Sequence, residues 1–195
     1  MIEQPHSRDP TPRTIPYPLT GGLTALGLLG AIYAAGTTSE AILPAQARIF
    51  LVAWLAVSVG CSFLITPRNF VVGFITGLFA MLVGWRIAGL HSVGIVTWPL
   101  LAAFAAFVLQ FFDCLRSDRK RGASALLSAS DWHLAFLRIY VGFDMVPHFT
   151  EKLYAGPGPR MDDIKAFTGF GLPMPEAFVI LGGSANLASA SEWAC

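Results

Sequence analysis

The sequence predicts an all-α, polytopic transmembrane helical bundle of about six helices, and three observations support this prediction. Hydrophobic residues make up 54% of the 195 residues. Charged residues make up only 13%, about half the share that is usual in soluble domains. The apolar residues also gather in runs near the length of about 20 residues that a helix needs to cross the hydrocarbon core of a bilayer. Lipid is therefore the expected surroundings of most of this chain.

Six segments of the sequence are expected to cross the membrane. The first four cover residues 19–36, 49–65, 70–90 and 93–112, and the short connections between them favour antiparallel neighbours in one bundle. Residues 132–149 form the fifth segment despite their charges, and residues 175–190 form a shorter sixth.

These segments divide the chain into four regions. Residues 1–18 contain five prolines, which prevent a helix and favour a disordered, cytoplasmic tail. Residues 19–114 are expected to form a four-helix transmembrane region, and residues 115–131 a basic cytoplasmic loop. Residues 132–195 then contribute two helices and an outer connecting loop, in which residues 161–169 are compatible with a short helix.

Orientation follows from the positions of Lys and Arg, which are in excess in the short cytoplasmic loops of membrane proteins. The densest basic cluster contains Arg116, Arg119, Lys120 and Arg121. Placing this cluster in the cytoplasm also places the N-terminus there. The connection between the fifth and sixth segments then lies on the outer side.

Several classes of function are disfavoured by what the sequence lacks. The net charge is only +1 and no basic stripe is present, so nucleic acid is not an expected partner. Cys61, Cys114 and Cys195 lack the spacing of zinc, iron–sulfur or c-type haem sites. Nucleotide-binding and hydrolase motifs are also missing. No metal is predicted, and the sequence leaves open whether the protein is an enzyme.

The fifth segment carries the strongest candidate for a ligand-binding site, because ionisable groups within a membrane-spanning helix are costly and are often functional. Arg138, Asp144, His148 and Lys152 lie within residues 137–152, and the last three follow one another at intervals of four residues. A neutral His beside a carboxylate suits proton relay or a hydrogen bond to a quinone carbonyl. In the structural alternative, Asp144 pairs with His148 or Arg138 while Lys152 extends to the interface.

Arg86 and His91 are further polar residues near the outer end of the third segment. Arg86 is expected to extend to the interface or to pair with Asp144, and the functional alternative is an anion-attracting site. His91 lies on the same outer side as His148, and two such residues could hold a haem iron. An interfacial His91 without a ligand is the preferred interpretation.

Small residues in the last two segments indicate close helix packing, because they let helix backbones approach each other in lipid. The candidate packing residues are Gly142, Gly182, Gly183, Ala185 and Ser189. Beyond the lipid bilayer, the expected partners are other membrane protein subunits or a second copy of the chain.

Residues 132–190 resemble the DoxX family of small bacterial and archaeal membrane proteins. The resemblance rests on Leu137-Arg138, Gly142, His148 and Lys152, followed by Phe167, Gly169, Gly171-Leu172-Pro173, Pro175 and a small-residue helix. It implies a bacterial or archaeal cytoplasmic membrane and a link to thiosulfate:quinone oxidoreductases and membrane redox complexes. Two helices stand where the family has four, and Asn186 replaces a typical Glu, so we expect a truncated module.

Three hypotheses follow from these observations. The leading one is an integral membrane subunit that anchors or stabilises a larger redox or energy-conserving complex. The alternative is a quinone-interacting oxidoreductase component that uses Asp144 and His148, with quinone as the possible cofactor. A small-anion transporter using Arg86 and Arg138 is less favoured, because no inverted repeat or pair of broken helices is evident.

Overall fold

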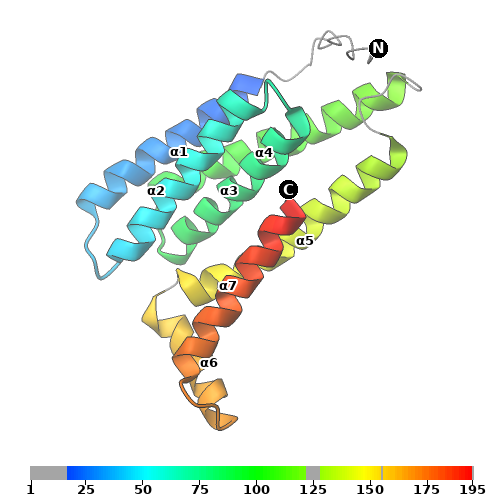
Figure 1. The fold of residues 1–195 in the computed structure, drawn as a ribbon. Coiled ribbons are helices and arrows are strands. Elements are labelled where there is room, and N and C mark those ends of the chain that lie inside the picture. The colour runs from blue at the N-terminus through cyan, green and yellow to red at the C-terminus, as the bar shows by residue number, and fades with distance from the viewer. Residues whose placement is uncertain (1–16, 122–127, 155, 195) are drawn as a thin grey trace, which may run out of the picture.

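The computed structural model describes residues 17–121, 128–154 and 156–194, and it confirms the all-α class for this part of the chain (Figure 1). The helices are α1 (Tyr17–Thr37), α2 (Ala45–Gly60), the short π-helix η1 (Cys61–Ile65), α3 (Phe70–Leu90), α4 (Gly94–Arg121), α5 (Ala129–Leu153), α6 (Pro157–Gly169) and α7 (Pro175–Ala194).

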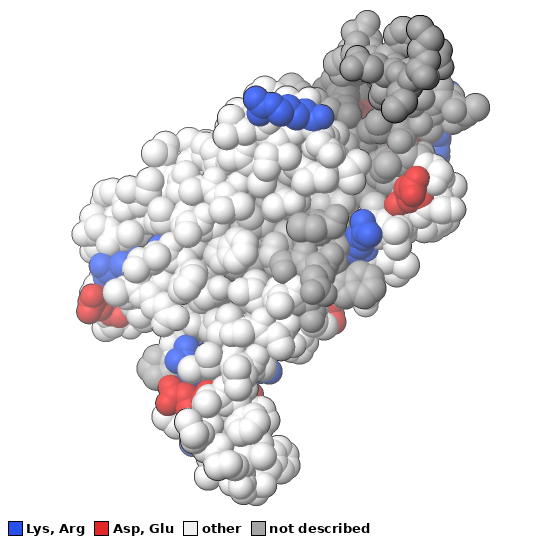
Figure 2. Space-filling view, viewed as in Figure 1, with Lys and Arg blue, Asp and Glu red and all other residues white. Residues whose placement is uncertain are grey.

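Four of the described helical segments are long and apolar enough to cross a membrane. They are Pro18–Thr37, Ala45–Ile65, Phe70–Leu90 and Gly94–Lys120. Figure 2 shows that the surface over α1 and α2 carries its charged side chains near the ends and almost none between them. The chain is therefore a multi-pass membrane protein, and the first four predicted segments each correspond to one of these helices.

Helix α3 is the central helix of the bundle. It packs against α2, α4 and α5, whereas α1 packs mainly against α4 and α2. Within the spanning segments, 67% of α3 is buried against 28% to 39% of the other three. The core contains fully buried side chains such as Leu55, Met81 and Leu100. Because α3 has neighbours on several sides, side chains on α3 can contact both halves of the molecule.

Helices α5, α6 and α7 form a second part that is attached to the first mainly through α3. Helix α7 runs along α5, and α6 lies beyond the end of the α1–α4 bundle (Figure 1). Helix α5 begins at a capping box in which Ser128 and Asp131 bind each other's backbone N–H groups. Hydrogen bonds from Ser128 lower the pKa of the Asp131 carboxyl group.

The end of η1 packs closely against the start of α3. The backbone N–H and the hydroxyl of Thr66 both donate to the carbonyl oxygen of Cys61, at 2.8 and 2.9 Å. Asn69 then caps α3 by accepting a hydrogen bond from the N–H of Val72. Gly73, in the first turn of α3, lies directly against Thr66.

Several of the predicted boundaries were wrong, because the helices α2, α5 and α7 are also longer at one or both ends than the predicted segments. Helix α4 continues to Arg121, so residues 115–121 are helical rather than part of a loop. Its last turns gain a tertiary contact, because the indole N–H of Trp132 donates to Asp118 at 3.1 Å. The helix in the outer connection begins at Pro157 rather than Met161, and Pro suits the first position of a helix.

The expected disordered tail falls largely outside the described residues. Residues 1–16 are not described, and Tyr17 and Pro18 already belong to α1. The part of the basic loop between 122 and 127 also lies outside them.

Candidate functional site

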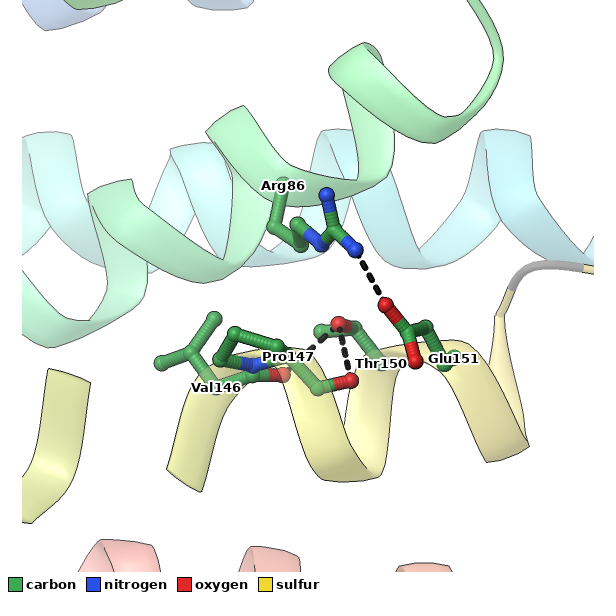
Figure 3. A network of polar contacts seen from close by, with 5 residues as sticks. All are labelled: Arg86, Val146, Pro147, Thr150 and Glu151. Carbon is green, nitrogen blue, oxygen red and sulfur yellow. Dashed lines mark hydrogen bonds and ion pairs between the residues drawn. The ribbon is translucent and has the colours of Figure 1, made fainter. Parts of the chain in front are cut away.

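An ion pair between α3 and α5 is the centre of the candidate site. The Arg86 guanidinium donates through Nη2 to the Glu151 carboxylate (Figure 3). The two side chains are 38% and 45% exposed. Within the described part of the chain, the buried Nε of Arg86 has no hydrogen-bond partner. One N–H donor of a charged group is thus left unused inside the protein.

Pro147 shapes the part of α5 that faces Arg86. Proline has no N–H, so α5 lacks one of its regular backbone hydrogen bonds at this turn. The hydroxyl of Thr150 donates to the carbonyl oxygens of Val146 and Pro147, at 2.7 and 3.2 Å (Figure 3). Thr150 is fully buried, so its hydroxyl is satisfied within α5 while the next residue, Glu151, reaches α3.

Two cavities adjoin each other along α3, and Arg86 lines one of them. The first, of about 420 Å³, contains Arg86 and is lined by Leu82, Trp85, Arg86, Gly89, Phe143, Val146 and Pro147. The second, of about 300 Å³, has an entirely apolar lining from α3, α4 and α5. Leu82 and Phe143 line both. We call the two together the α3–α5 groove.

The candidate residues of the fifth segment do not come together in this groove. Asp144 and His148 are exposed on α5, and neither lines the α3–α5 groove. The prediction that Arg86 could pair with Asp144 was wrong, because Arg86 pairs with Glu151. Asp144 and Glu151 are seven positions apart, which is two helical turns or about 10 Å along α5, and Glu151 is the carboxylate that reaches Arg86.

Arg138 and Lys152 are both half-buried on α5. Arg138 lines a small cavity between α3 and α5 together with Gly142. The backbone carbonyl of Lys152 accepts a hydrogen bond from Arg160 Nε at 3.0 Å. This contact ties α6 to the end of α5.

His91, at the end of α3, connects the segment before α2 with the end of α5. Its Nδ1 lies 2.9 Å from the carbonyl oxygen of Ile42, and its Nε2 lies 2.9 Å from that of Tyr154. The side chain is buried. Both ring nitrogens face carbonyl oxygens, so neither is directed at a haem iron in this structure. Neither backbone partner could be predicted from the sequence, because Ile42 and Tyr154 are far from His91 along the chain.

The predicted packing residues lie on α5 and on two different faces of α7. A side chain at Gly183 would meet Lys152 and Leu153 of α5 at 3.0 Å, so Gly183 serves packing within the chain. A side chain at Gly182 would meet nothing within 4 Å, and Ala185 is exposed. Gly142 faces Phe79 of α3, and the side chain of Ser189 lies outside the described part.

The described residues contain no group of three or more His, Cys, Asp or Glu side chains that could hold a metal ion. Cys61 and Cys114 are buried on separate helices. The arrangement instead offers a polar anchor, Arg86, at one end of an apolar groove.

No family model, curated protein or solved structure matches this chain. The resemblance of residues 132–190 to the DoxX family therefore rests on the sequence motifs alone.

Proposed function

We propose that this protein is an integral membrane subunit that docks through α5 against another protein of a redox or energy-conserving membrane complex. One observation carries the docking proposal: Asp144 and His148 are exposed on a helix of 25 residues whose other exposed side chains include Leu137, Tyr140 and Phe143. The redox setting is supported only by the DoxX resemblance.

Energetics favours a protein partner over lipid at this face. Asp144 lies roughly nine residues before the end of α5, or about 14 Å along the helix axis. A short carboxylate side chain cannot reach the interface from that depth. An Asp exposed to the hydrocarbon core costs about 2.5–3.5 kcal/mol even on insertion scales. A partner helix that presents a cationic or hydrogen-bonding side chain to Asp144 removes most of this cost.

Helix α7 offers a second surface beside α5 for the same partner. Gly182 and Ala185 are three residues apart on α7, and their surroundings are open. Small residues on one face of a helix let a second helix approach closely in lipid. The proposed subunit interface therefore combines the Asp144 face of α5 with the Gly182 face of α7.

This proposal includes a six-span topology in which α5 and α7 cross the membrane and the N-terminus is cytoplasmic. The basic end of α4 supports it through the positive-inside tendency. Single cysteines at Ser117 and Met161, in a cysteine-free background, are expected to react with a membrane-impermeant maleimide from opposite sides. Labelling of both positions from the same side would contradict this topology.

The docking proposal predicts that a photoreactive amino acid at Tyr140 captures one discrete membrane protein in native membranes. The same probe at Val57, exposed on α2, is the matched control and should capture only lipid. Asp144→Leu should remove the adduct at Tyr140 and shift the native complex to a smaller size, while the chain still inserts.

Two results would count against the subunit role. Lipid adducts alone at Tyr140, with a wild-type chain that migrates as a monomer in native membranes, would show that no partner covers α5. An adduct of twice the chain mass would show that the partner is a second copy of this chain, so that the protein forms a homo-oligomer and is not an accessory subunit of another complex.

A further inference from the structure

We infer that His91 makes a pH-sensitive connection between the α1–α2 loop and the end of α5, which the protonated ring holds at both ends and the neutral ring at only one. We call the two contacts of His91, with the carbonyl oxygens of Ile42 and Tyr154, the His91 bridge. Three features carry this inference: the number of donors that the bridge needs, its position at a helix end, and the charges around it. Neither Asp144 nor His148 takes part in it, so the bridge is separate from the proposed docking face.

The bridge needs a donor on both ring nitrogens. Nδ1 of His91 lies 2.9 Å from the carbonyl oxygen of Ile42, and Nε2 lies 2.9 Å from that of Tyr154. A carbonyl oxygen can only accept a hydrogen bond. A neutral imidazole has one N–H and one lone pair, whereas an imidazolium has two N–H groups. In either neutral tautomer the ring therefore directs a lone pair at one of the two carbonyl oxygens, and only the imidazolium makes both hydrogen bonds.

The position of the bridge favours a positive charge on the ring. Tyr154 is the C-cap residue of α5, and the carbonyl groups at a helix C-terminus carry a partial negative charge. His91 is only 8% exposed, so water has little access to a carbonyl group that loses its donor there. A buried acceptor without a partner destabilises the folded state, so loss of the proton weakens the bridge.

Charged side chains flank each segment that meets at the bridge. They are Glu40 and Arg48 around Ile42, Arg86 before His91, and Glu151, Lys152 and Arg160 around Tyr154. Arg86 and Glu151 neutralise each other, and the guanidinium groups of Arg48 and Arg160 are directed at other backbone carbonyl oxygens. The remaining cations oppose a proton on the ring, whereas the two carbonyl oxygens of the bridge favour it. This opposition allows the ring to release its proton when the pH rises.

His91 is the group of the bridge that changes its charge near neutral pH. Among the side-chain types named above, only an unperturbed histidine titrates between about pH 5 and 8. Burial raises the pKa of the Tyr154 phenol, and a hydrogen bond with Trp54 only partly offsets this effect, so the phenol stays neutral. A falling pH therefore adds the second N–H and closes the bridge. A rising pH removes that N–H and leaves one contact.

Opening of the bridge affects the second part of the molecule. Helices α5, α6 and α7 are attached to the bundle mainly through α3, and the bridge adds a connection from the end of α5 to the α1–α2 loop. Arg160 of α6 donates to the carbonyl oxygens of Lys152 and Leu153, so α6 follows the end of α5. Phe50 of α2 still packs on the Tyr154 ring, at 4.7 Å between centroids. We therefore expect the end of α5 and α6 to shift away from the loop without separation of the helices.

The test measures the distance between the α1–α2 loop and α6 in the full chain in nanodiscs. Spin labels at Ser39 and Met161, which are both exposed, report this distance by double electron–electron resonance in a cysteine-free background. The measurement is made at about pH 5.5 and about pH 8.5, on either side of the range in which histidine changes its charge. Loss of a hydrogen bond from a charged group should raise the fraction of the longer-distance population about tenfold at the higher pH.

Two variants assign the response to His91. His91→Gln has no proton to take up, so its distance distribution should be the same at both pH values and should resemble that of the wild type at the higher one. His133→Gln is the matched control, because His133 is exposed near the start of α5, at the opposite end of this helix. It should respond to pH as the wild type does. Helicity and elution volume verify the fold of each variant.

A second measurement observes the ring itself and does not require the His91 variant to fold. The chain has four histidines, and replacement of His6, His133 and His148 by Gln leaves His91 alone. Labelling with nitrogen-15 histidine then reports the protonation of the His91 ring by solid-state NMR. Two protonated ring nitrogens are expected at the lower pH and one at the higher pH.

Each of three results would overturn the inference. A neutral His91 ring in the folded protein at the lower pH would show that the ring does not donate to both carbonyl oxygens. Equal distance distributions of the wild type at both pH values would show that the bridge does not respond to pH. A pH response that persists in His91→Gln would assign the movement to another titratable group.

Discussion

Replacing Glu151 with Leu is expected to destabilise the folded protein by about 2 kcal/mol. The size of this loss of stability depends on whether the ion pair lies in water or in the membrane. In water, a pair as exposed as Arg86 and Glu151 would contribute at most about 1 kcal/mol. Arg86 lies in the membrane-spanning helix α3, where an unpaired Arg costs more. Reversible unfolding in mixed micelles, followed by far-ultraviolet circular dichroism, measures the change in the free energy of unfolding.

Two further variants separate the ion pair from simple loss of a carboxylate. Arg86→Leu combined with Glu151→Leu removes both charges, and we expect it to recover most of the lost stability, because no charge then remains unpaired. Glu176→Leu is the matched control, since Glu176 is largely exposed and lies 4.0 Å from Arg160. Equal effects of Glu151→Leu and Glu176→Leu would contradict a membrane-level pair.

The helical class and the four apolar spans could be predicted because they depend on local composition. Hydropathy over about 20 residues is sufficient to find a spanning helix. The same measure explains the error at α4: residues 115–121 are charged, so hydropathy ends the segment at 112 although the helix continues to Arg121. Polar residues at the end of a helix carry no hydropathy signal that separates them from a loop.

The partners in the candidate site could not be predicted, because they depend on how α3 and α5 are rotated and shifted against each other. Sequence spacing placed Asp144, His148 and Lys152 on one stripe, but only the packing of α5 on α3 decides that Glu151 is the carboxylate facing Arg86. Arg48 was likewise not recognised as a binder of three backbone carbonyl groups. Residue patterns reveal side-chain types, whereas these partners are backbone atoms brought close by the fold.

Gly73→Ala is expected to have a large effect, destabilising the protein by about 3 kcal/mol. A Cβ at this position would lie 2.5 Å from the Cα of Thr66 and closer still to its backbone nitrogen. These are backbone atoms, which cannot rotate away as the end of a side chain can. Thr66 is also fixed by its two hydrogen bonds to Cys61. Relief of the clash therefore requires α3 to move or the end of η1 to open.

Gly22→Ala is the matched control for this substitution. Gly22 lies inside α1, and a Cβ there would meet nothing within 4 Å. Because Ala is the better helix former, this variant should be unchanged or more stable by up to about 1 kcal/mol. The same unfolding measurement applies to both variants. Similar stability of Gly73→Ala and Gly22→Ala would mean that η1 and α3 are not held as closely as the structure places them. The π-helical turn would then be free to relax, and the position of α3, on which the Arg86 site depends, would have to be fixed by its contacts with α4 and α5 instead.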